Sequence, residues 1–155
     1  MIGLEIRDYL PSDQPNVLRF FEEVLPALGF TFDVQSKDSD LLRIDQVYQS
    51  QGGKFLIALV EGEVVGTIAL RKLDEQTCEL KRFYVLERCR GNGIGRRLLE
   101  AVIAHGRAGK WKTMLLDTSS KSPAALSLFR AQGFVEIPRY NRDPFAEIFM
   151  ALSMR

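Results

Sequence analysis

The stretch RCRGNGIGRR, residues 88–97, decides how the rest of the sequence is interpreted. It follows a run typical of a β-strand, residues 77–85, and it leads into an apolar pattern with helical spacing that begins at Ile94. Glycine allows positive φ and carries no Cβ, so successive backbone N–H groups in such a turn can face inward. The first turn of the following helix adds unsatisfied N–H groups and the positive end of its dipole. This glycine turn therefore predicts a cradle for a phosphate or pyrophosphate.

The spacing of the glycines separates this turn from two better-known phosphate motifs. Gly91, Gly93 and Gly95 alternate, whereas the dinucleotide fingerprint G-x-G-x-x-G would need a glycine at the position of Arg96. The Walker pattern G-x-x-x-x-G-K-[ST] is also absent from the sequence. His105 is the single histidine and has no partners that would make a metal site, so we expect a packing or surface role for it and no metal.

Charge is distributed unevenly along the chain. The formal net charge is +1, but it is −7 over residues 1–80, +7 over residues 81–112 and +1 over residues 113–155. A short basic block inside an acidic chain favours a localised anion site, and the overall balance argues against a nucleic-acid partner.

Length and composition favour one soluble globular domain over residues 1–155, because 155 residues with 46% hydrophobic content can bury a sizeable core. No apolar run is long enough to span a membrane, so we expect no membrane partner. The N-terminus resembles neither a signal peptide nor a transit peptide. Without such a leader, Cys78 and Cys89 are expected to be free thiols in a reducing cytosol, which predicts a cytoplasmic protein.

The apolar patterns predict a mixed α/β domain. Expected strands cover residues 1–7, 54–61, 63–72, 77–85, 113–117, 134–139 and 146–152. Expected helices cover residues 13–29, where Pro26 should kink or end the helix early, a short segment near 41–48, residues 94–109 and residues 122–133. The three strands from 54 to 85 form an antiparallel meander, and the strand at 113–117 follows a helix, so it should lie parallel to the strand at 77–85.

Two motifs resemble the GNAT superfamily of N-acetyltransferases. Arg90-x-x-Gly93-x-Gly95, between a strand and a helix, looks like the acetyl-CoA-binding motif of that family. The family's N-x-x-A-x-x-x-Y-x-x-x-G-F appears at residues 122–134 as SPAALSLFRAQGF. The resemblance covers residues 54–153 well and the N-terminal third by topology alone. It implies a GNAT-like fold: a twisted, mostly antiparallel sheet of six to seven strands with helices on both faces, splayed between the strands at 77–85 and 113–117.

The resemblance also implies where acetyl-CoA, as co-substrate, would bind. Backbone groups of residues 83–85 would pair with the pantetheine arm, and N–H groups of residues 90–96 would hold the pyrophosphate. The residues implied to contact acetyl-CoA are Phe83, Tyr84, Val85, Arg90, Gly91, Asn92, Gly93, Ile94, Gly95, Arg96, Ser122 and Phe129.

The second motif departs from the family at two positions. Phe129 stands where the family often has a tyrosine that protonates the leaving thiolate, and Ser122 replaces a frequent asparagine. Tyr84 and Tyr140 are candidates to replace that acid. Tyr140 lies in a segment, residues 137–144, that resembles the border of the acceptor site in many bacterial members, and the alternative is a solvated loop tyrosine.

Glu79 is the candidate general base, because acetyl transfer to an amine requires a free lone pair on nitrogen. The alternative is a carboxylate paired with Lys81 or Arg71 on a half-exposed face. Regular alternation predicts two faces for this strand. One would carry Glu79, Lys81, Phe83 and Val85, and the other Cys78, Leu80, Arg82 and Tyr84.

The leading hypothesis is an N-acetyltransferase that moves an acetyl group from acetyl-CoA to a primary amine of a small molecule or peptide. A non-catalytic acyl-CoA-binding regulatory module is the alternative, because the tyrosine and asparagine of the second motif are missing. A phosphate-binding regulator that contacts nucleic acid is disfavoured by the acidic first 80 residues. The acidic residues Asp33, Asp38, Asp40 and Asp45 either attract a cationic amine or form a solvated loop, and a homodimer is an open alternative to a monomer.

Overall fold

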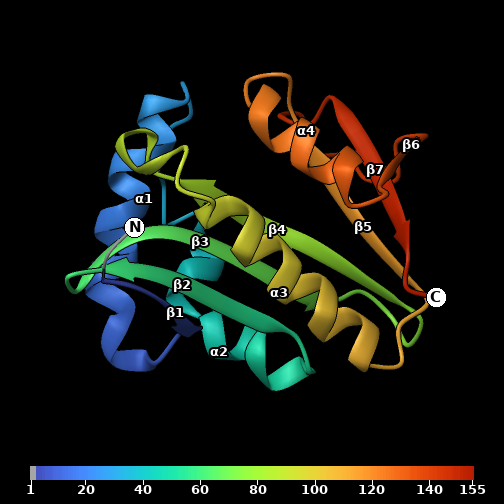
Figure 1. Ribbon diagram of the computed structural model, residues 1–155, viewed down its shortest axis with the longest axis horizontal. Helices are drawn as coiled ribbons and strands as arrows, with labels where there is room; N and C mark the ends of the chain where they lie inside the picture. The colour runs from blue at the N-terminus through green and yellow to red at the C-terminus, as the bar shows by residue number, and fades with distance from the viewer. Residues whose placement is uncertain (1–2) are drawn as a thin grey trace.

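The structure, a computed structural model, describes residues 3–155. Its centre is a seven-stranded sheet with the order β1-β2-β3-β4-β5-β7-β6 (Figure 1). The strands are β1 (Leu4–Asp8), β2 (Lys54–Val60), β3 (Glu63–Lys72), β4 (Thr77–Val85), β5 (Thr113–Thr118), β6 (Val135–Ile137) and β7 (Ile148–Ser153). The β4–β5 pair is parallel, and the other neighbours in this sheet are antiparallel. The mixed α/β class and the mostly antiparallel sheet confirm the predicted fold.

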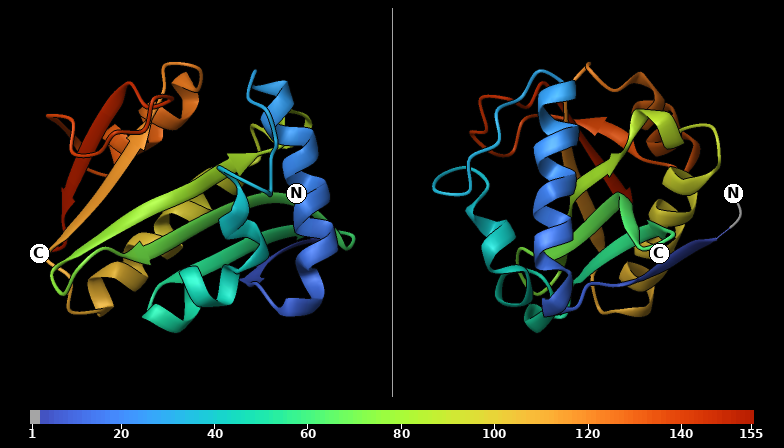
Figure 2. Two further views of the ribbon diagram at one scale, coloured as in Figure 1. Left: turned by 180° about the vertical axis from the view of Figure 1, so that it is seen from behind. Right: turned by 90° about the vertical axis from the view of Figure 1, so that its left-hand side faces the viewer.

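Helices cover both faces of this sheet, as Figure 2 shows. They are α1 (Gln14–Ala27), α2 (Ile44–Val47), α3 (Ile94–Ala108) and α4 (Pro123–Ala131). On the face of α1 and α2, the ring of Phe21 packs edge-on against Tyr84 of β4. On the opposite face, α3 lies close to β3, where a Cβ at Gly66 would come within 3.2 Å of a Leu98 methyl group. Glycine at this position therefore allows the close approach of α3.

The two parallel strands separate after a short contact. β4 and β5 pair over three positions that end at Glu79 and Leu115. Beyond them the ribbons diverge, and β5 continues with β7, to which it pairs along its whole length (Figure 1). The second half of β4 therefore has a strand neighbour on its β3 side alone, within the part of the chain that the structure describes. The predicted splay between these strands is confirmed.

A β-bulge interrupts β4 at Arg82. Thr67 faces Tyr84 across the β3–β4 ladder, yet Ala69 faces Lys81, so β4 contains one extra residue here. Arg82 has φ of 55°, and its carbonyl oxygen accepts a hydrogen bond of 2.8 Å from Thr67 Oγ1. The extra residue changes which side chains share a face.

The predicted alternation is therefore wrong beyond Lys81. Tyr84 lies on the same face as Glu79, where it meets Phe21 of α1. Phe83 instead turns toward α3 and α4, where its ring lies 5.5 Å from that of Phe129. The local sequence gives no sign of the bulge that reverses the two faces, because the bulge residue is an arginine and not a glycine.

Most element boundaries agree with the sequence, and a few differ. Pro26 lies inside the last turn of α1, which ends one residue later, so the proline marks the end of the helix. The expected strand at 134–139 is shorter, Val135–Ile137, and the first two residues of the expected strand at 1–7 lie outside the described residues. None of the described helices is both long and apolar enough to cross a membrane.

Candidate active site

The glycine turn has the geometry of an anion cradle. Gly91 and Gly93 have φ of 80° and 75°, and Gly93 is the residue from which α3 starts. The Asn92 side chain donates to the Cys89 carbonyl at 3.0 Å, which holds the turn in shape. Among residues 3–155, no protein acceptor faces the backbone N–H groups of Gly91, Asn92 and Gly93. With the first-turn N–H groups from Ile94 to Arg96, they form a row of free donors.

The arginines of this turn are not equivalent. Arg88 forms ion pairs with Glu23 of α1, at 2.5 Å, and with Glu63 of β3, at 2.9 Å, so it ties the turn to the scaffold. Arg96 is 68% exposed and has one long contact of 3.5 Å to Glu100. Arg90 is exposed, and no carboxylate lies within ion-pair distance of it among the described residues. Arg90 and Arg96 therefore remain available to an anion.

The open half of β4 leads from the glycine turn toward the point where β4 and β5 separate. A cavity of about 600 Å³ lies in this opening, and its lining includes Phe83, Tyr84, Ser122 and Phe129. Val85 lies at the end of the strand, opposite Gly66 of β3. The structure thus gathers along one cavity several residues that sequence reasoning assigned to acetyl-CoA.

Residues of α4 form one wall of this cavity. Phe129 is 3% exposed, and its ring packs against Phe83 and Phe134 at centroid distances of 5.5 and 5.7 Å. Ser122 is the residue before α4, and its hydroxyl does not cap the helix. Phe129 is therefore a packing residue beside the cavity, and the Ser122 hydroxyl stays free for other contacts.

Glu79 lies where β4 and β5 part and is almost completely buried, with 1% exposure. Its Oε1 atom accepts from Arg71 Nε at 2.8 Å across the β3–β4 ladder. Its Oε2 atom accepts from the hydroxyl of Tyr140 at 2.5 Å. The ion pair with Arg71 that the sequence offered as an alternative is present, but Glu79 is buried and not half-exposed as that alternative supposed. Tertiary folding adds Tyr140 from 61 residues away.

Tyr140 is not a solvated loop residue. Its ring packs edge-on against Phe149 of β7 at 5.4 Å. Burial, followed by the hydrogen bond to Glu79, raises the pKa of Tyr140 far above its ordinary value. Tyr140 therefore keeps its proton at neutral pH, and its hydroxyl donates a hydrogen bond to Glu79. Neither Glu79 nor Tyr140 lines the cavity, whereas Arg71, the other partner of Glu79, does.

A second buried group of charges, the Arg82 cluster, consists of Arg82, Asp38, Asp40 and Tyr48. Arg82 donates to Asp38 at 3.0 Å and to both carboxylate oxygens of Asp40 at 2.5 and 3.0 Å. Tyr48 donates to Asp40 at 2.5 Å. Burial alone would raise the pKa of Asp40, but the hydrogen bonds and charge of Arg82 outweigh it and leave that pKa below its usual value.

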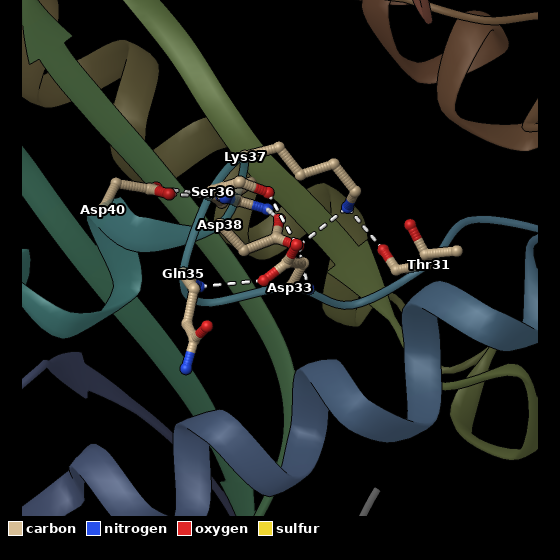
Figure 3. Close-up of polar contacts among 8 residues, drawn as sticks. Thr31, Asp33, Gln35, Ser36, Lys37, Asp38 and Asp40 are labelled. Atoms are coloured by element: carbon tan, nitrogen blue, oxygen red, sulfur yellow. Dashed lines mark hydrogen bonds and ion pairs between the residues drawn. The ribbon is translucent and has the colours of Figure 1, made fainter.

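Sequence reasoning missed this cluster because the bulge at Arg82 sets the orientation of its side chain. The acidic loop also satisfies its own carboxylates, as Figure 3 shows. Asp33 accepts from the Gln35 N–H at 2.9 Å and from the Ser36 hydroxyl at 2.7 Å. Asp38 accepts from Lys37 at 2.7 Å as well as from Arg82. Three of the four acidic residues noted in the sequence, Asp33, Asp38 and Asp40, therefore already have hydrogen-bond or ion-pair partners. Their carboxylates are neither fully solvated nor free to bind a cationic amine.

The single histidine and the two cysteines have contacts typical of packing residues. His105 lies 3.0 Å from the Gly52 carbonyl oxygen, and Cys78 and Cys89 are buried free thiols. Burial raises the pKa of Cys78 to about 12. Among the described residues, no group of three or more His, Cys, Asp or Glu side chains is arranged to hold a metal ion.

Comparison with known proteins identifies the class. The family model described as "Acetyltransferase (GNAT) family" matches residues 18–134, so the chain belongs to the GNAT acetyltransferase family. The Escherichia coli protein named uncharacterized N-acetyltransferase YjgM is 29% identical over 131 residues, which are 81% of this chain and 78% of that protein.

Two solved structures show how similar the fold is. A GNAT-family acetyltransferase from Staphylococcus aureus superposes with a TM-score of 0.88 at 25% identity, covering 98% of this chain and 99% of that one. A phosphinothricin acetyltransferase from Sinorhizobium meliloti, solved in complex with AcCoA, superposes with a TM-score of 0.75 at 21% identity, covering 98% and 89%. At that identity the second match shows the fold alone.

Proposed function

We propose that this protein is an N-acetyltransferase that moves an acetyl group from acetyl-CoA to a primary amine of a small molecule or peptide. The observation that carries the proposal is the opening between β4 and β5. The glycine turn lies at its wide end, and the Glu79–Tyr140 pair lies where the strands part. Family membership supports the acyl transfer, and the AcCoA complex of the Sinorhizobium protein supports the choice of donor.

The described residues fit acetyl-CoA. The free N–H groups from Gly91 to Arg96 would hold the pyrophosphate, with Arg90 and Arg96 adding full charges at the rim. The unpaired edge of β4 from Phe83 to Val85 would take up the pantetheine arm as an added strand does. Ser122 offers a free hydroxyl, and Phe129 offers an apolar wall beside the thioester end.

The amine must lose a proton before or during attack. A lysine-like amine has a pKa of about 10.4, about 3.4 units above neutral pH, so deprotonation requires about 4.6 kcal/mol. The Glu79–Tyr140 pair is arranged as a relay for this proton. The Tyr140 oxygen takes the proton from the amine, directly or through water, while its own proton passes to Glu79.

In the transfer itself, the new bond joins the amine nitrogen to the acetyl carbon, and the bond from that carbon to sulfur breaks. The electron pair leaves with the CoA thiolate. Because a thiol has a pKa of about 8.5, this leaving group departs with little help from an acid. Phe129 in place of the family's frequent tyrosine is therefore compatible with turnover.

Two measurements on the purified protein test this function. Calorimetric titration with acetyl-CoA should show saturable binding, and release of free thiol from acetyl-CoA should depend on an added amine. Saturable binding without thiol release from a broad panel of amines, amino acids and peptides would instead identify the non-catalytic acyl-CoA-binding module. Absence of acetyl-CoA binding would overturn both functions.

A further inference from the structure

Some of the charged side chains that line the cavity have ion-pair partners, and others do not. Five cationic side chains line the cavity: Lys37, Arg43, Arg71, Lys81 and Arg82. Arg82 and Lys37 are already matched by Asp38 and Asp40. These two acids are among the four that the sequence offered for attracting a cationic amine, and their pairing leaves them no free charge for that role.

The other three cations have donors to spare. Neither Arg43 nor Lys81 has a carboxylate within ion-pair distance in the described part of the chain. Arg71 uses Nε for Glu79, and no acceptor for its two terminal nitrogens is found among residues 3–155. Arg71 and Lys81 lie on the same face of neighbouring strands, since Arg71 faces Glu79 and Lys81 is two residues further along β4.

The acids that remain on the cavity wall come from the other side of the opening. Asp117 of β5 accepts from the Asn141 side chain at 2.6 Å, and Asp143 accepts from the Phe145 N–H at 2.9 Å. The β3–β4 side of the cavity is therefore cationic beside Glu79, and the β5 side is acidic. A ligand that carries both an anionic and an amino group matches this distribution.

We propose that the acetyl acceptor is a small amine that carries a carboxylate, such as an amino acid, and that Arg43, Arg71 and Lys81 bind this carboxylate. The proposal rests on the acetyltransferase function above and adds its substrate class. Arginine and lysine bind carboxylates through charge-assisted hydrogen bonds, and the half-buried position of Arg71 strengthens such contacts. The carboxylate would then hold the amine beside Tyr140.

The test compares acceptors that differ in the carboxylate alone. Each member of an amino-acid panel is assayed beside its own amide, with thiol release as the readout. We expect at least about tenfold higher kcat/KM for the free acid, corresponding to about 1.4 kcal/mol. Amides that react as well as or better than the acids would overturn the carboxylate proposal and leave the acetyltransferase function standing. Absence of turnover with every amine would overturn the function itself.

Variants locate the effect. R43Q and K81M should each raise KM for the acid by about tenfold and remove most of the preference over the amide, with unchanged calorimetric affinity for acetyl-CoA. R107Q is the matched control, because Arg107 is an exposed cation in the last turn of α3 and does not line the cavity. Arg71 is left intact, since it also holds Glu79. If R43Q and K81M both keep the preference for acids, these residues do not bind the carboxylate and the proposal fails.

Discussion

The glycine turn and the Arg82 cluster both depend on arginine, but they use it in opposite ways. In the turn, Arg90 and Arg96 are exposed and largely unpaired, and the free donors come from consecutive backbone N–H groups. In the Arg82 cluster, the guanidinium is buried and bonded to carboxylates more than 40 residues away. The first arrangement leaves charge free for a ligand, whereas the second uses charge to hold the loop that carries Asp38 and Asp40 on β4.

The Glu79–Tyr140 pair belongs with the second kind of arrangement, because its partners also come together through tertiary folding. Under the proposed function, a local motif would bind the donor, whereas contacts between distant residues would supply the chemistry and hold the loop. Each variant below disturbs one of these two arrangements. R82M, G93A and the two turn-arginine variants each have a counterpart that leaves the arrangement intact.

The largest effect is expected from E79Q. Glutamine keeps the shape but cannot take up the proton, so kcat should fall by about 10² to 10⁴-fold, while acetyl-CoA affinity stays unchanged by calorimetry. Y140F should cause a loss of similar size, and the double variant should lose little more, because the two side chains act as one relay. Unchanged turnover of E79Q at several pH values would remove Glu79 as the base.

A loss of stability is expected from R82M. Removing the buried guanidinium leaves Asp40 without a cationic partner and Asp38 with Lys37 alone, so the free energy of unfolding should fall by about 3 to 5 kcal/mol in urea titrations. R88M is the control, because Arg88 also has two glutamate partners but is half exposed, and its loss should be much smaller. Equal losses for the two variants would show that the buried cluster does not stabilise the fold more than a surface pair.

A smaller effect, confined to the turn, is expected from G93A. Alanine is strained at the positive φ of 75°, so the turn should shift and its row of N–H donors should be disturbed, and acetyl-CoA affinity should fall by about tenfold. G62A is matched, since Gly62 has φ of 80° in the β2–β3 turn and equally open surroundings. Both variants should lose about 1 kcal/mol of stability, and G93A alone should lose affinity. Equal affinity of the two variants would contradict the cradle.

The smallest effect is expected from R90A and R96A. Each should weaken acetyl-CoA binding by about threefold at low salt and reduce its salt dependence, because exposed charges are screened. R107A, which removes an exposed cation from the far end of α3, should leave both quantities unchanged. Survival of full affinity in the double variant R90A/R96A would show that the arginines do not contribute to binding.

Much of the fold could be predicted from local pattern. The strands at 63–72 and 77–85 have the expected bounds, and the strand at 113–117 is parallel to its neighbour, as predicted. The splay after Glu79 agrees with what the family resemblance implied. Apolar periodicity and turn residues depend on neighbouring positions in the chain, so they can be recognised in a single sequence. Alternation beyond Lys81 was predicted wrongly, because the bulge places an extra residue in β4 without a glycine to mark it.

In the candidate site too, the local features could be predicted from the sequence, and the contacts between distant residues could not. The glycine turn could be predicted without any structure, since ten consecutive residues contain both the conformational freedom and the charge that an anion cradle needs. The sequence also named Glu79 and Tyr140, but as separate candidates. Three features become visible in the folded chain alone: these two side chains share a hydrogen bond, Arg82 pairs with Asp38 and Asp40, and the free cations lie beside Glu79. The physical reason is that these contacts join residues far apart in the chain, and their geometry depends on a bulge and a strand separation that the sequence pattern does not position.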